Sequence, residues 1–527
     1  MSSDSISTKR LKSAEESVGH PEEAFTYDEQ HQHVPAKYMG TSRDRDDMCQ
    51  LGKTQVLRRN FRFVSILGFA CTLIATWEVV LSLLGFALLD GGTAGLIWGF
   101  LAVSCGFSLV FASLAEIASM SPTAGGQYHW VSEFAPPSCQ NILAISQCAI
   151  VTIAFLAGTI IQGLLILNLP EYIPQRWHGT LLVIAISAFS IIFNTFLAKK
   201  LPLVEALLLL LHIIGIIAII VPLVVLAPRS SAEVVFTQFN NGGGWSTAGV
   251  AVMVGLPPAI ASMIGYDCAV HMAEEIKDAS KTLPQAMMSA VGVNFVLGLA
   301  VILTICFTVG DIEAVLASPT GIPFIQIFFN ATKSHAATNA MTSIVVITLV
   351  ASTITEVATA SRQTWSFARD RGVPFADFLS HVNPSWNIPL HAVIVSLVVT
   401  ILLALINVGS TTALNAITSL TVASLMSAYL ISIGCILLKR IRGEALPSRR
   451  WSLGIYGGFI NAAAMLFLFP LFVFSFFPLT KEVDATTMNW SSLIYVSVIL
   501  FATVYYFAYG KKTYVPPSSL VRRPFKP

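Results

Sequence analysis

The residues best suited to do chemistry in this sequence gather in one apolar stretch, residues 248–275, which reads AGVAVMVGLPPAIASMIGYDCAVHMAEE. At about 1.5 Å per residue, this stretch is long enough to cross a bilayer as a helix. Pro257 and Pro258 remove two backbone donors, and Gly255 and Gly265 loosen the chain on either side. We therefore predict a broken membrane helix.

Two ionisable residues, Asp267 and His271, follow the expected break, four residues apart and on one face if a helix resumes. Backbone that is freed from helical bonding at membrane depth is tolerated where protein or a water-filled cavity satisfies it. A broken helix that carries ionisable groups is thus a candidate substrate site. The alternative is a proline-kinked helix whose polar ends reach the interface.

Other apolar runs also hold charges. Glu78 lies beside Trp77 near the middle of residues 62–88, where a carboxylate costs roughly 2.5–3.5 kcal/mol and should face a cavity or a partner. Glu205 and His212 lie seven residues apart, two turns along one face of a later run. His212 could carry a proton, because the free pKa of histidine is about 6.5, or it could be a neutral packing residue.

A second set of charges follows the sixth and eighth apolar runs. Ion pairs between these two groups would form an inner gate, whereas a solvated set of loop charges is the alternative. The residues concerned are Glu274 and Glu275 in the first group, and Arg362, Arg369, Asp370 and Arg371 in the second.

These residues belong to an integral membrane protein. The chain has 527 residues, of which 54% are hydrophobic and 11% charged, and its mean hydropathy is +0.71. A soluble protein carries about 25% charged residues. The net charge of +2 gives no reason to expect a nucleic-acid partner.

Several other function classes lack their signals. The eight cysteines show no metal-ligand spacing, so no metal or cofactor is expected. No HExxH, nucleophile elbow or Walker pattern occurs, which argues against a membrane enzyme and a nucleotide-driven pump. An ion channel would need a symmetrically repeated polar filter segment, and the sequence shows none.

Twelve apolar runs organise the chain, and basic residues predict its orientation. With the N-terminus inside, only Arg176, Arg229, Lys333 and Lys481 of the 31 Lys and Arg fall in outward connections, so both termini are predicted to be cytoplasmic. The runs are approximately residues 62–88, 95–118, 138–168, 179–198, 203–227, 248–273, 285–309, 339–361, 390–408, 412–438, 455–477 and 491–509.

Three spaced segments resemble fungal permeases of the amino acid–polyamine–organocation superfamily: PTAGGQYHWVSEF, SMIGYDCAVHMAEEIKDASKTLPQAM and SRQTWSFARDRGVPF. The resemblance covers about residues 50–515 and is closest to the amino acid/choline transporter branch, which includes GABA and choline permeases. It implies an all-α membrane protein of twelve transmembrane helices, with a LeuT-like inverted repeat of five plus five helices and two extra C-terminal helices. It also implies secondary active transport by alternating access, most often coupled to protons.

The expected domain organisation follows from the helix arrangement of the family and from the composition of each segment. Residues 1–60 are polar and acid-rich, and we expect a disordered cytoplasmic tail there. A ten-helix transport core would occupy residues 61–440, with repeats at about 61–227 and 248–438. Two peripheral helices would follow over 441–510, and a cytoplasmic C-tail over 511–527.

The resemblance also implies that substrate binds where the first and sixth helices unwind. Backbone N–H groups and carbonyls at the two breaks would hold a substrate carboxylate and ammonium group, while Trp77 and Tyr266 could shield the pocket or stack on a cation. Asp267 could gate or bind amine. The expected substrate-binding residues are Ala75, Thr76, Trp77 and Glu78 in the first helix, which departs from the family's glycine-rich version, and Ser262, Met263, Ile264, Gly265, Tyr266 and Asp267 in the sixth.

The coupling ion is the last expectation. Some proton-coupled relatives keep a lysine in the fifth helix, which has none here, so His212, Asp267 and His271 are the candidate proton-coupling residues. We predict a proton-coupled carrier of amino acids or small amines such as GABA, in the plasma membrane or the vacuolar membrane. The alternatives are a choline or polyamine permease and a non-transporting nutrient sensor. The expected partners are the small-molecule substrate, protons and the lipid bilayer.

Overall fold

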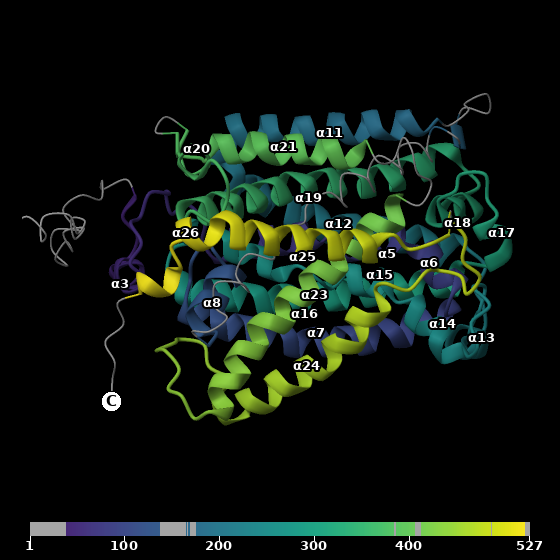
Figure 1. Ribbon diagram of the computed structural model, residues 1–527. Coiled ribbons are helices and arrows are strands. Elements are labelled where there is room, and N and C mark those ends of the chain that lie inside the picture. The colour runs from purple at the N-terminus through teal and green to yellow at the C-terminus, as the bar shows by residue number, and fades with distance from the viewer. Residues whose placement is uncertain are drawn as a thin grey trace, which may run out of the picture.

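The computed structural model describes residues 38–136, 165, 167–168, 175–383, 386–405, 413–485 and 487–521. Within these ranges the regular elements are helices, accompanied by three isolated β-bridges. Most of the long helices run side by side along one axis, whereas two long helices from the C-terminal part of the chain cross the others obliquely, and several of the short helices lie at the two ends of the bundle (Figure 1). The predicted all-helical class is confirmed.

The helices of the described residues follow one another along the chain in this order: α3 (Ser42–Gln50), α4 (Phe63–Ile74), α5 (Thr76–Ser82), α6 (Leu84–Leu89), α7 (Gly92–Met120), α8 (Gln127–Phe134), α11 (Arg176–Phe196), η2 (Ala198–Lys200), α12 (Leu201–Leu226), α13 (Ala232–Thr237), α14 (Ala248–Val254), α15 (Pro257–Ala261), η3 (Tyr266–Glu275), α16 (Ala279–Thr308), α17 (Ile312–Leu316), α18 (Pro323–Thr332), α19 (His335–Arg369), α20 (Ala376–Leu379), α21 (Leu390–Ala404), α23 (Ala413–Ile441), η4 (Gly454–Tyr456), α24 (Gly457–Phe474), α25 (Ser491–Tyr505), η5 (Tyr506–Gly510), α26 (Lys511–Thr513) and η6 (Pro517–Ser519).

Among the described residues, ten segments are long and apolar enough to span a membrane, which makes this an integral, multi-pass membrane protein. Eight of them correspond to single long helices or to a long helix with its short extensions. The other two, Phe63–Ser82 and Ala248–Glu275, are interrupted. These two segments are called the first and sixth spans below.

Two of the twelve predicted runs are not among these ten segments. The ninth run forms α21, a helix of 15 residues that packs against α11 and α19. The third run, residues 138–168, lies outside the described residues except for positions 165, 167 and 168.

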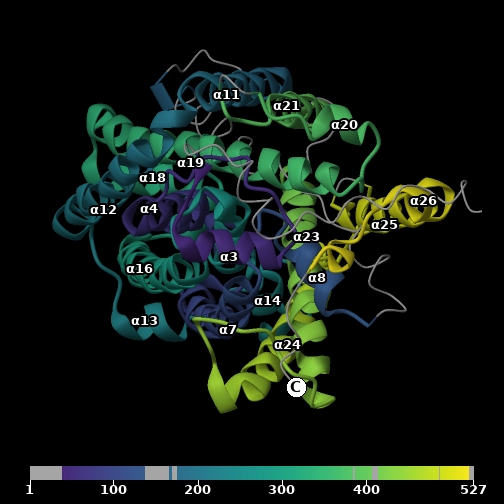
Figure 2. The same cartoon turned by 90° about the vertical axis from the view of Figure 1, so that its left-hand side faces the viewer.

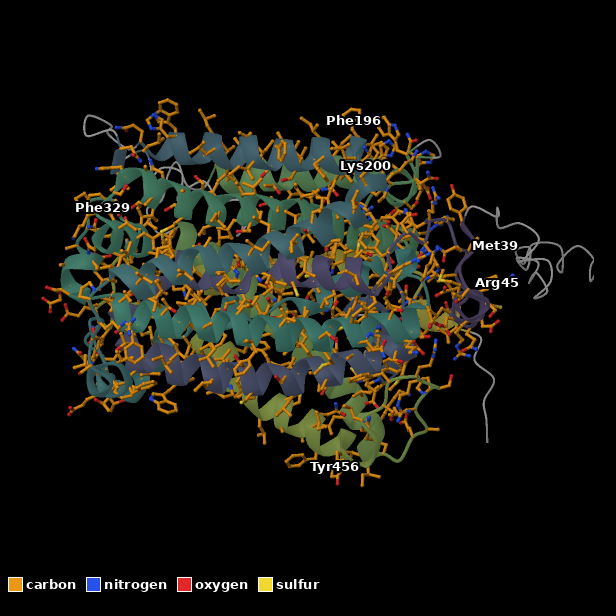
Figure 3. All side chains as sticks on the ribbon, turned by 180° about the vertical axis from the view of Figure 1, so that it is seen from behind. Met39, Arg45, Phe196, Lys200, Phe329 and Tyr456 are labelled. Carbon is orange, nitrogen blue, oxygen red and sulfur yellow. The ribbon has the colours of Figure 1, made fainter. Side chains whose placement is uncertain are left out.

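The bundle has two distinct ends. Helices α3, α8, α20 and α26 lie at one end, which we call the α3 end, and α13, α17 and α18 lie at the other (Figures 1 and 2). Figure 3 shows Met39 and Arg45 at the α3 end and Phe329 at the opposite end.

The first span breaks at Ala75, whose φ of 47° is left-handed and costs a non-glycine residue roughly 1–2 kcal/mol. Helix α4 ends before it and α5 begins after it, in a sequence without proline or glycine at the break. The expected unwinding at Ala75–Trp77 therefore falls at the observed break.

The sixth span breaks as its prolines predict, but into three pieces. Helix α14 ends at Val254, and α15 starts with Pro257 and Pro258 at positions where missing N–H groups cost nothing. A second interruption follows at residues 262–265, where Gly265 has a φ of 105°. A Cβ there would lie 3.0 Å from Ile74 Cδ1, so glycine is required both by backbone conformation and by the close approach of α4.

The chain before the first span is folded where the structure describes it, contrary to the expected disordered tail through residue 60. Thr41 and Asp44 form a capping box at the start of α3. The Asp44 carboxylate also accepts backbone N–H groups of Asp278 (3.0 Å) and Ala279 (3.1 Å) and pairs with Arg59 (3.2 Å). Composition could not reveal this, because the backbone partners of Asp44 lie more than 200 residues away in the sequence.

Candidate substrate and coupling site

The first and sixth spans meet at their breaks. The hydroxyl of Thr76, the first residue of α5, donates a 2.8 Å hydrogen bond to the Ser262 carbonyl and lies 3.4 Å from the Tyr266 hydroxyl. From α19, Ser352 donates a 2.5 Å hydrogen bond to the Leu73 carbonyl near the end of α4. Side chains of neighbouring helices thus satisfy carbonyls at the breaks, as irregular backbone at membrane depth requires.

All ten residues predicted to bind substrate are buried at or beside this junction. The Ser262 hydroxyl donates to the Ala259 carbonyl (2.9 Å), and the Tyr266 hydroxyl donates to Met263 Sδ (3.8 Å). These hydroxyls are therefore already engaged within the sixth span. The ten residues are Ala75, Thr76, Trp77, Glu78, Ser262, Met263, Ile264, Gly265, Tyr266 and Asp267.

A carboxylate and an imidazole face each other next to the first break. His212 Nδ1 of α12 lies 2.8 Å from Glu78 Oε1, and His212 Nε2 lies 3.1 Å from the Asn294 amide oxygen of α16. All three side chains are buried. The pair is neutral overall when the imidazole is protonated, and it carries a net negative charge when only Glu78 is ionised.

Three polar atoms beside this pair have no hydrogen-bond partner among the described residues. They are Glu78 Oε2, Trp77 Nε1 and Asn294 Nδ2. Asn294 contacts His212 directly, and the Trp77 ring lies 5.7 Å from the His212 ring, so the three atoms belong to one local cluster. A buried carboxylate oxygen and a buried indole N–H without partners are costly, and they define a place where a polar ligand would be satisfied.

Asp267 is held on both sides. The Gln127 side-chain amide donates to one carboxylate oxygen, and the Tyr429 hydroxyl donates to the other. Gln127 is the first residue of α8 and Tyr429 belongs to α23. This carboxylate therefore connects the sixth span to two other helices.

His271 does not share a face with Asp267. The sixth span resumes as the 3₁₀ helix η3, and with three residues per turn positions four apart diverge by roughly 120°. His271 Nδ1 lies 2.8 Å from the Ala124 carbonyl, and a Cβ on Gly126 would lie 2.7 Å from His271 Cε1. The imidazole thus packs against the Gly125–Gly126 loop, and the expected common face was wrong.

Glu205 forms a separate buried contact. The Thr355 hydroxyl of α19 donates a 2.9 Å hydrogen bond to Glu205 Oε1. The face shared by Glu205 and His212 points into the bundle at both positions, as the seven-residue spacing predicted. The partners differ, however, because Glu205 contacts α19 whereas His212 contacts α5 and α16.

The charges at the α3 end form ion pairs rather than a solvated set. Arg362 Nε lies 2.8 Å from Glu275 Oε1, and Arg369 contacts both oxygens of Glu274 at 2.8 and 3.0 Å. Asp370 pairs with Lys53 and accepts a 3.0 Å hydrogen bond from Tyr128. Arg371 makes no ion pair with the part of the chain that the structure describes.

A segment that the sequence did not single out completes this cluster. Residues 53–61, which we call the N-terminal strap, lie across the end of the sixth span. Arg59 donates to the carbonyls of Ala273 (3.1 Å) and Ile276 (2.5 Å), and Gln55 donates to the Glu274 carbonyl (2.8 Å). Burial lowers the pKa of the Lys53 ammonium, and the nearby Arg369 lowers it further, whereas Asp370 raises it.

The strap also joins the two spans through their backbones. Phe61 N–H donates to the Glu275 carbonyl, and Lys277 N–H donates to the Phe61 carbonyl, both at 3.0 Å. These bonds form a parallel bridge between Phe61 and Ile276. The first and sixth spans are thus connected at the α3 end as well as at their breaks.

Sequence reasoning missed several residues of the site. Gln127 follows the Gly125–Gly126 turn directly, and Asn294 is a polar residue inside an otherwise apolar run, so both carried a weak signal. Tyr429 was not singled out, because a lone tyrosine in an apolar run does not indicate a contact with Asp267. Lys53 and Arg59 were assigned to the tail.

The fold and the site together define a membrane transporter. Two interrupted spans meet at a buried polar junction, and charged residues close one end of it. This arrangement is typical of carriers that bind substrate where helices are discontinuous.

The chain belongs to the amino acid permease family, whose model matches residues 61–504. A Macrophomina phaseolina protein named as an amino acid/polyamine transporter is 31% identical over 441 residues, which cover 81% of this chain and 97% of that one. The choline transporter of Saccharomyces cerevisiae is 28% identical, covering 89% and 85% of the two chains. Amino-acid permease 2 of Neurospora crassa is 27% identical, covering 89% and 88%.

These relatives are transporters rather than enzymes. Among solved structures, a manganese transporter of Eremococcus coleocola aligns with 91% of this chain and 97% of its own, at 13% identity and a TM-score of 0.49. The family relation supports transport of amino acids or amines, and it confirms the resemblance drawn from the three sequence segments.

Proposed function

We propose that this protein is a secondary active transporter that moves an amino acid or a related small amine, such as GABA, by alternating access. One observation carries the proposal. The Thr76–Ser262 hydrogen bond joins two broken spans at a buried junction, beside the unpartnered atoms of Glu78 and Trp77. A small zwitterion or amine would supply the missing hydrogen bonds.

In this proposal the substrate lies at the two breaks. Its ammonium group contacts Glu78 Oε2, while backbone at residues 75–77 and 262–265 holds its polar end and Tyr266 and Trp77 enclose the apolar part. The remaining predicted site residues, Ser262, Met263 and Ile264, form the wall. Asp267 acts as a gate, because each of its two oxygens already accepts a hydrogen bond, one from α8 and one from α23.

We propose protons as the coupling ions. The support is the buried contact between Glu78 and His212, in which protonation of the imidazole changes the net charge beside the substrate. Asp267 is a second candidate, because its carboxylate is also buried and can be protonated. His271 is the weakest of the three, since it packs against the Ala124 carbonyl.

The larger arrangement is also proposed. Twelve transmembrane helices would form two inverted repeats of five, at about residues 61–227 and 248–438, followed by two peripheral helices over 441–510. The α3 end would be cytoplasmic, with both termini on that side, because 27 of the 31 Lys and Arg are predicted there. The plasma membrane is the proposed location, with the vacuolar membrane as the alternative.

A choline or polyamine permease is the second candidate. The relatives named for choline and for amino acid/polyamine transport favour it, as do the two aromatic residues at the breaks. The unpartnered Glu78 oxygen favours a ligand with N–H donors over the quaternary ammonium of choline. A sensor that binds substrate without net transport is the third candidate.

Uptake by the purified protein in proteoliposomes tests these candidates together. Arginine, GABA, a neutral amino acid, choline and a polyamine are offered with and without an imposed pH gradient. We expect one substrate to accumulate above equilibrium and this accumulation to collapse with a protonophore. Counterflow without accumulation would refute proton coupling, and saturable binding without flux would identify a sensor.

A further inference from the structure

A groove opens at the α3 end between two segments that are distant in sequence. One wall is the turn from α19 to α20, and the other is the last long helix, α25, with its extension η5. Its volume of about 700 Å³ lies within the range of about 300–1,000 Å³ that holds small ligands. Figure 2 shows α25 and α26 standing off from the main bundle on the side of α20.

The two walls are fixed to each other. Val515 N–H donates a 3.0 Å hydrogen bond to the Asp370 carbonyl, and the Tyr514 ring lies 5.9 Å from the Phe367 ring. Arg371 and Phe375, on the first wall, both have left-handed backbone, with φ of 57° and 56°. Such conformations persist in non-glycine residues only where the surrounding structure imposes them.

The floor of the groove is aromatic and open. Phe375 is 82% exposed and Phe378 is 54% exposed, and Tyr505 and Tyr509 line the opposite wall with their rings 5.7 Å apart. The buried Tyr505 hydroxyl has no hydrogen-bond partner among the described residues. Tyrosines at the end of a span mark the level of lipid headgroups.

The rim of the groove is positively charged. Arg371 lines it, and Lys511 and Lys512 are exposed immediately before the lining residue Thr513. Within the described ranges none of these three cations forms an ion pair. Asp377 is the one acidic residue among the lining side chains.

We propose that this groove binds an anionic phospholipid. The acyl chain lies along Phe375 and Phe378, and the headgroup phosphate contacts Arg371 and the two lysines. Basic pockets between helices at the cytoplasmic side of membrane proteins bind anionic headgroups in this way. Neither a free phosphate nor a zwitterionic lipid would use both the aromatic floor and the excess positive charge.

Spin-labelled lipids in nanodiscs test this proposal with the full-length protein. The discs contain phosphatidylcholine with a trace of spin-labelled phosphatidylserine or spin-labelled phosphatidylcholine, and the immobilised fraction gives the selectivity between the two. Both leaflets of a nanodisc are accessible, so the result does not depend on the proposed orientation or on the proposed transport function.

We expect selectivity for phosphatidylserine that falls about fivefold for each cation removed in the Arg371→Ala/Lys511→Ala/Lys512→Ala series at low salt. The charge-preserving variant Arg371→Lys/Lys511→Arg/Lys512→Arg should retain it, which separates loss of charge from misfolding. Lys199→Ala/Lys200→Ala removes another lysine pair, at the start of a different span, and should also retain it. An equal loss of phosphatidylserine selectivity in the Lys199→Ala/Lys200→Ala control would show that general surface charge, rather than this groove, causes the selectivity. Unchanged selectivity in the triple alanine variant would overturn the proposal.

Discussion

At the scale of single residues, the site depends on carboxylates whose partners come from distant parts of the chain. Glu78 contacts His212 across 134 residues of sequence, and Asp267 contacts Gln127 across 140 and Tyr429 across 162. Sequence patterns identified the carboxylates and the histidine, because a charge inside an apolar run is conspicuous. Their partners carried at most a weak signal, because a glutamine, an asparagine or a tyrosine does not reveal which distant residue it will contact, and only the fold selects these pairs.

Asp267→Asn should lower uptake by about tenfold to a hundredfold with near-normal abundance in the membrane. Gln127 and Tyr429 both donate to the carboxylate, and an amide offers one acceptor in place of two. Loss of a hydrogen bond to a charged group costs roughly 1.5–3 kcal/mol. The measurement is initial uptake per molecule at the membrane. Gln127→Ala is the matched test of the same contact, and wild-type rates for Asp267→Asn would remove this residue from the mechanism.

His212→Gln should abolish the acceleration of uptake by an inward proton gradient. Glutamine preserves hydrogen-bonding capacity toward Glu78 and Asn294 but cannot titrate. The measurement is the ratio of uptake with and without the gradient in proteoliposomes. His335→Gln changes an exposed histidine at the start of α19 and should leave that ratio unchanged. Proton coupling that survives in His212→Gln would return His212 to a packing role.

At the scale of elements, the sequence predicted the two breaks with different success. Proline and glycine mark the sixth span, and the structure breaks there. The first span has no such marker at Ala75, so its break followed only from the family resemblance. The 3₁₀ form of η3 had no sequence signal, because the same residues could form either helix type. In the fold η3 packs mainly against α4, α16 and α19.

Gly265→Ala should impair both transport and stability. Its φ of 105° is unfavourable for alanine, and the new Cβ would press on Ile74 at 3.0 Å, so we expect a loss of about 1–3 kcal/mol. Thermal unfolding in detergent and substrate uptake are the two measurements. Gly292→Ala lies in α16 with open space around its Cα and should be neutral or slightly stabilising. A neutral Gly265→Ala would show that the break tolerates rearrangement.

At the scale of the whole molecule, composition was sufficient for the membrane class and the all-helical fold. Ten candidate spans appear among the described residues where twelve apolar runs were counted, partly because α21 is shorter than its run. The folded strap is the largest departure from expectation. Its polarity suggested a solvated tail, whereas Arg59 and Gln55 use that polarity to satisfy backbone carbonyls of the sixth span.

Lys53→Ala should favour the conformation that is open at the α3 end. The substitution removes the partner of Asp370 and leaves a buried carboxylate unpaired, a change that costs roughly 3–5 kcal/mol in the closed form. Alkylation of Cys268, and of cysteines introduced singly at residues 260–267, reports the opening, and substrate should protect them. Lys277→Ala, an exposed lysine just beyond the sixth span, is the matched control. Equal alkylation rates in Lys53→Ala and the unmodified background would exclude the strap from gating.

The backbone bridge between Phe61 and Ile276 has a consequence for the mechanics of the molecule. The α3-end halves of the first and sixth spans share two main-chain hydrogen bonds there, and the Thr76–Ser262 bond links them again at mid-depth. Because the first and sixth spans are joined at two levels, they cannot slide past each other along their axes. They can still tilt together as one unit. The two spans therefore move as a unit. A displacement of either span moves both sides of the junction between the two breaks.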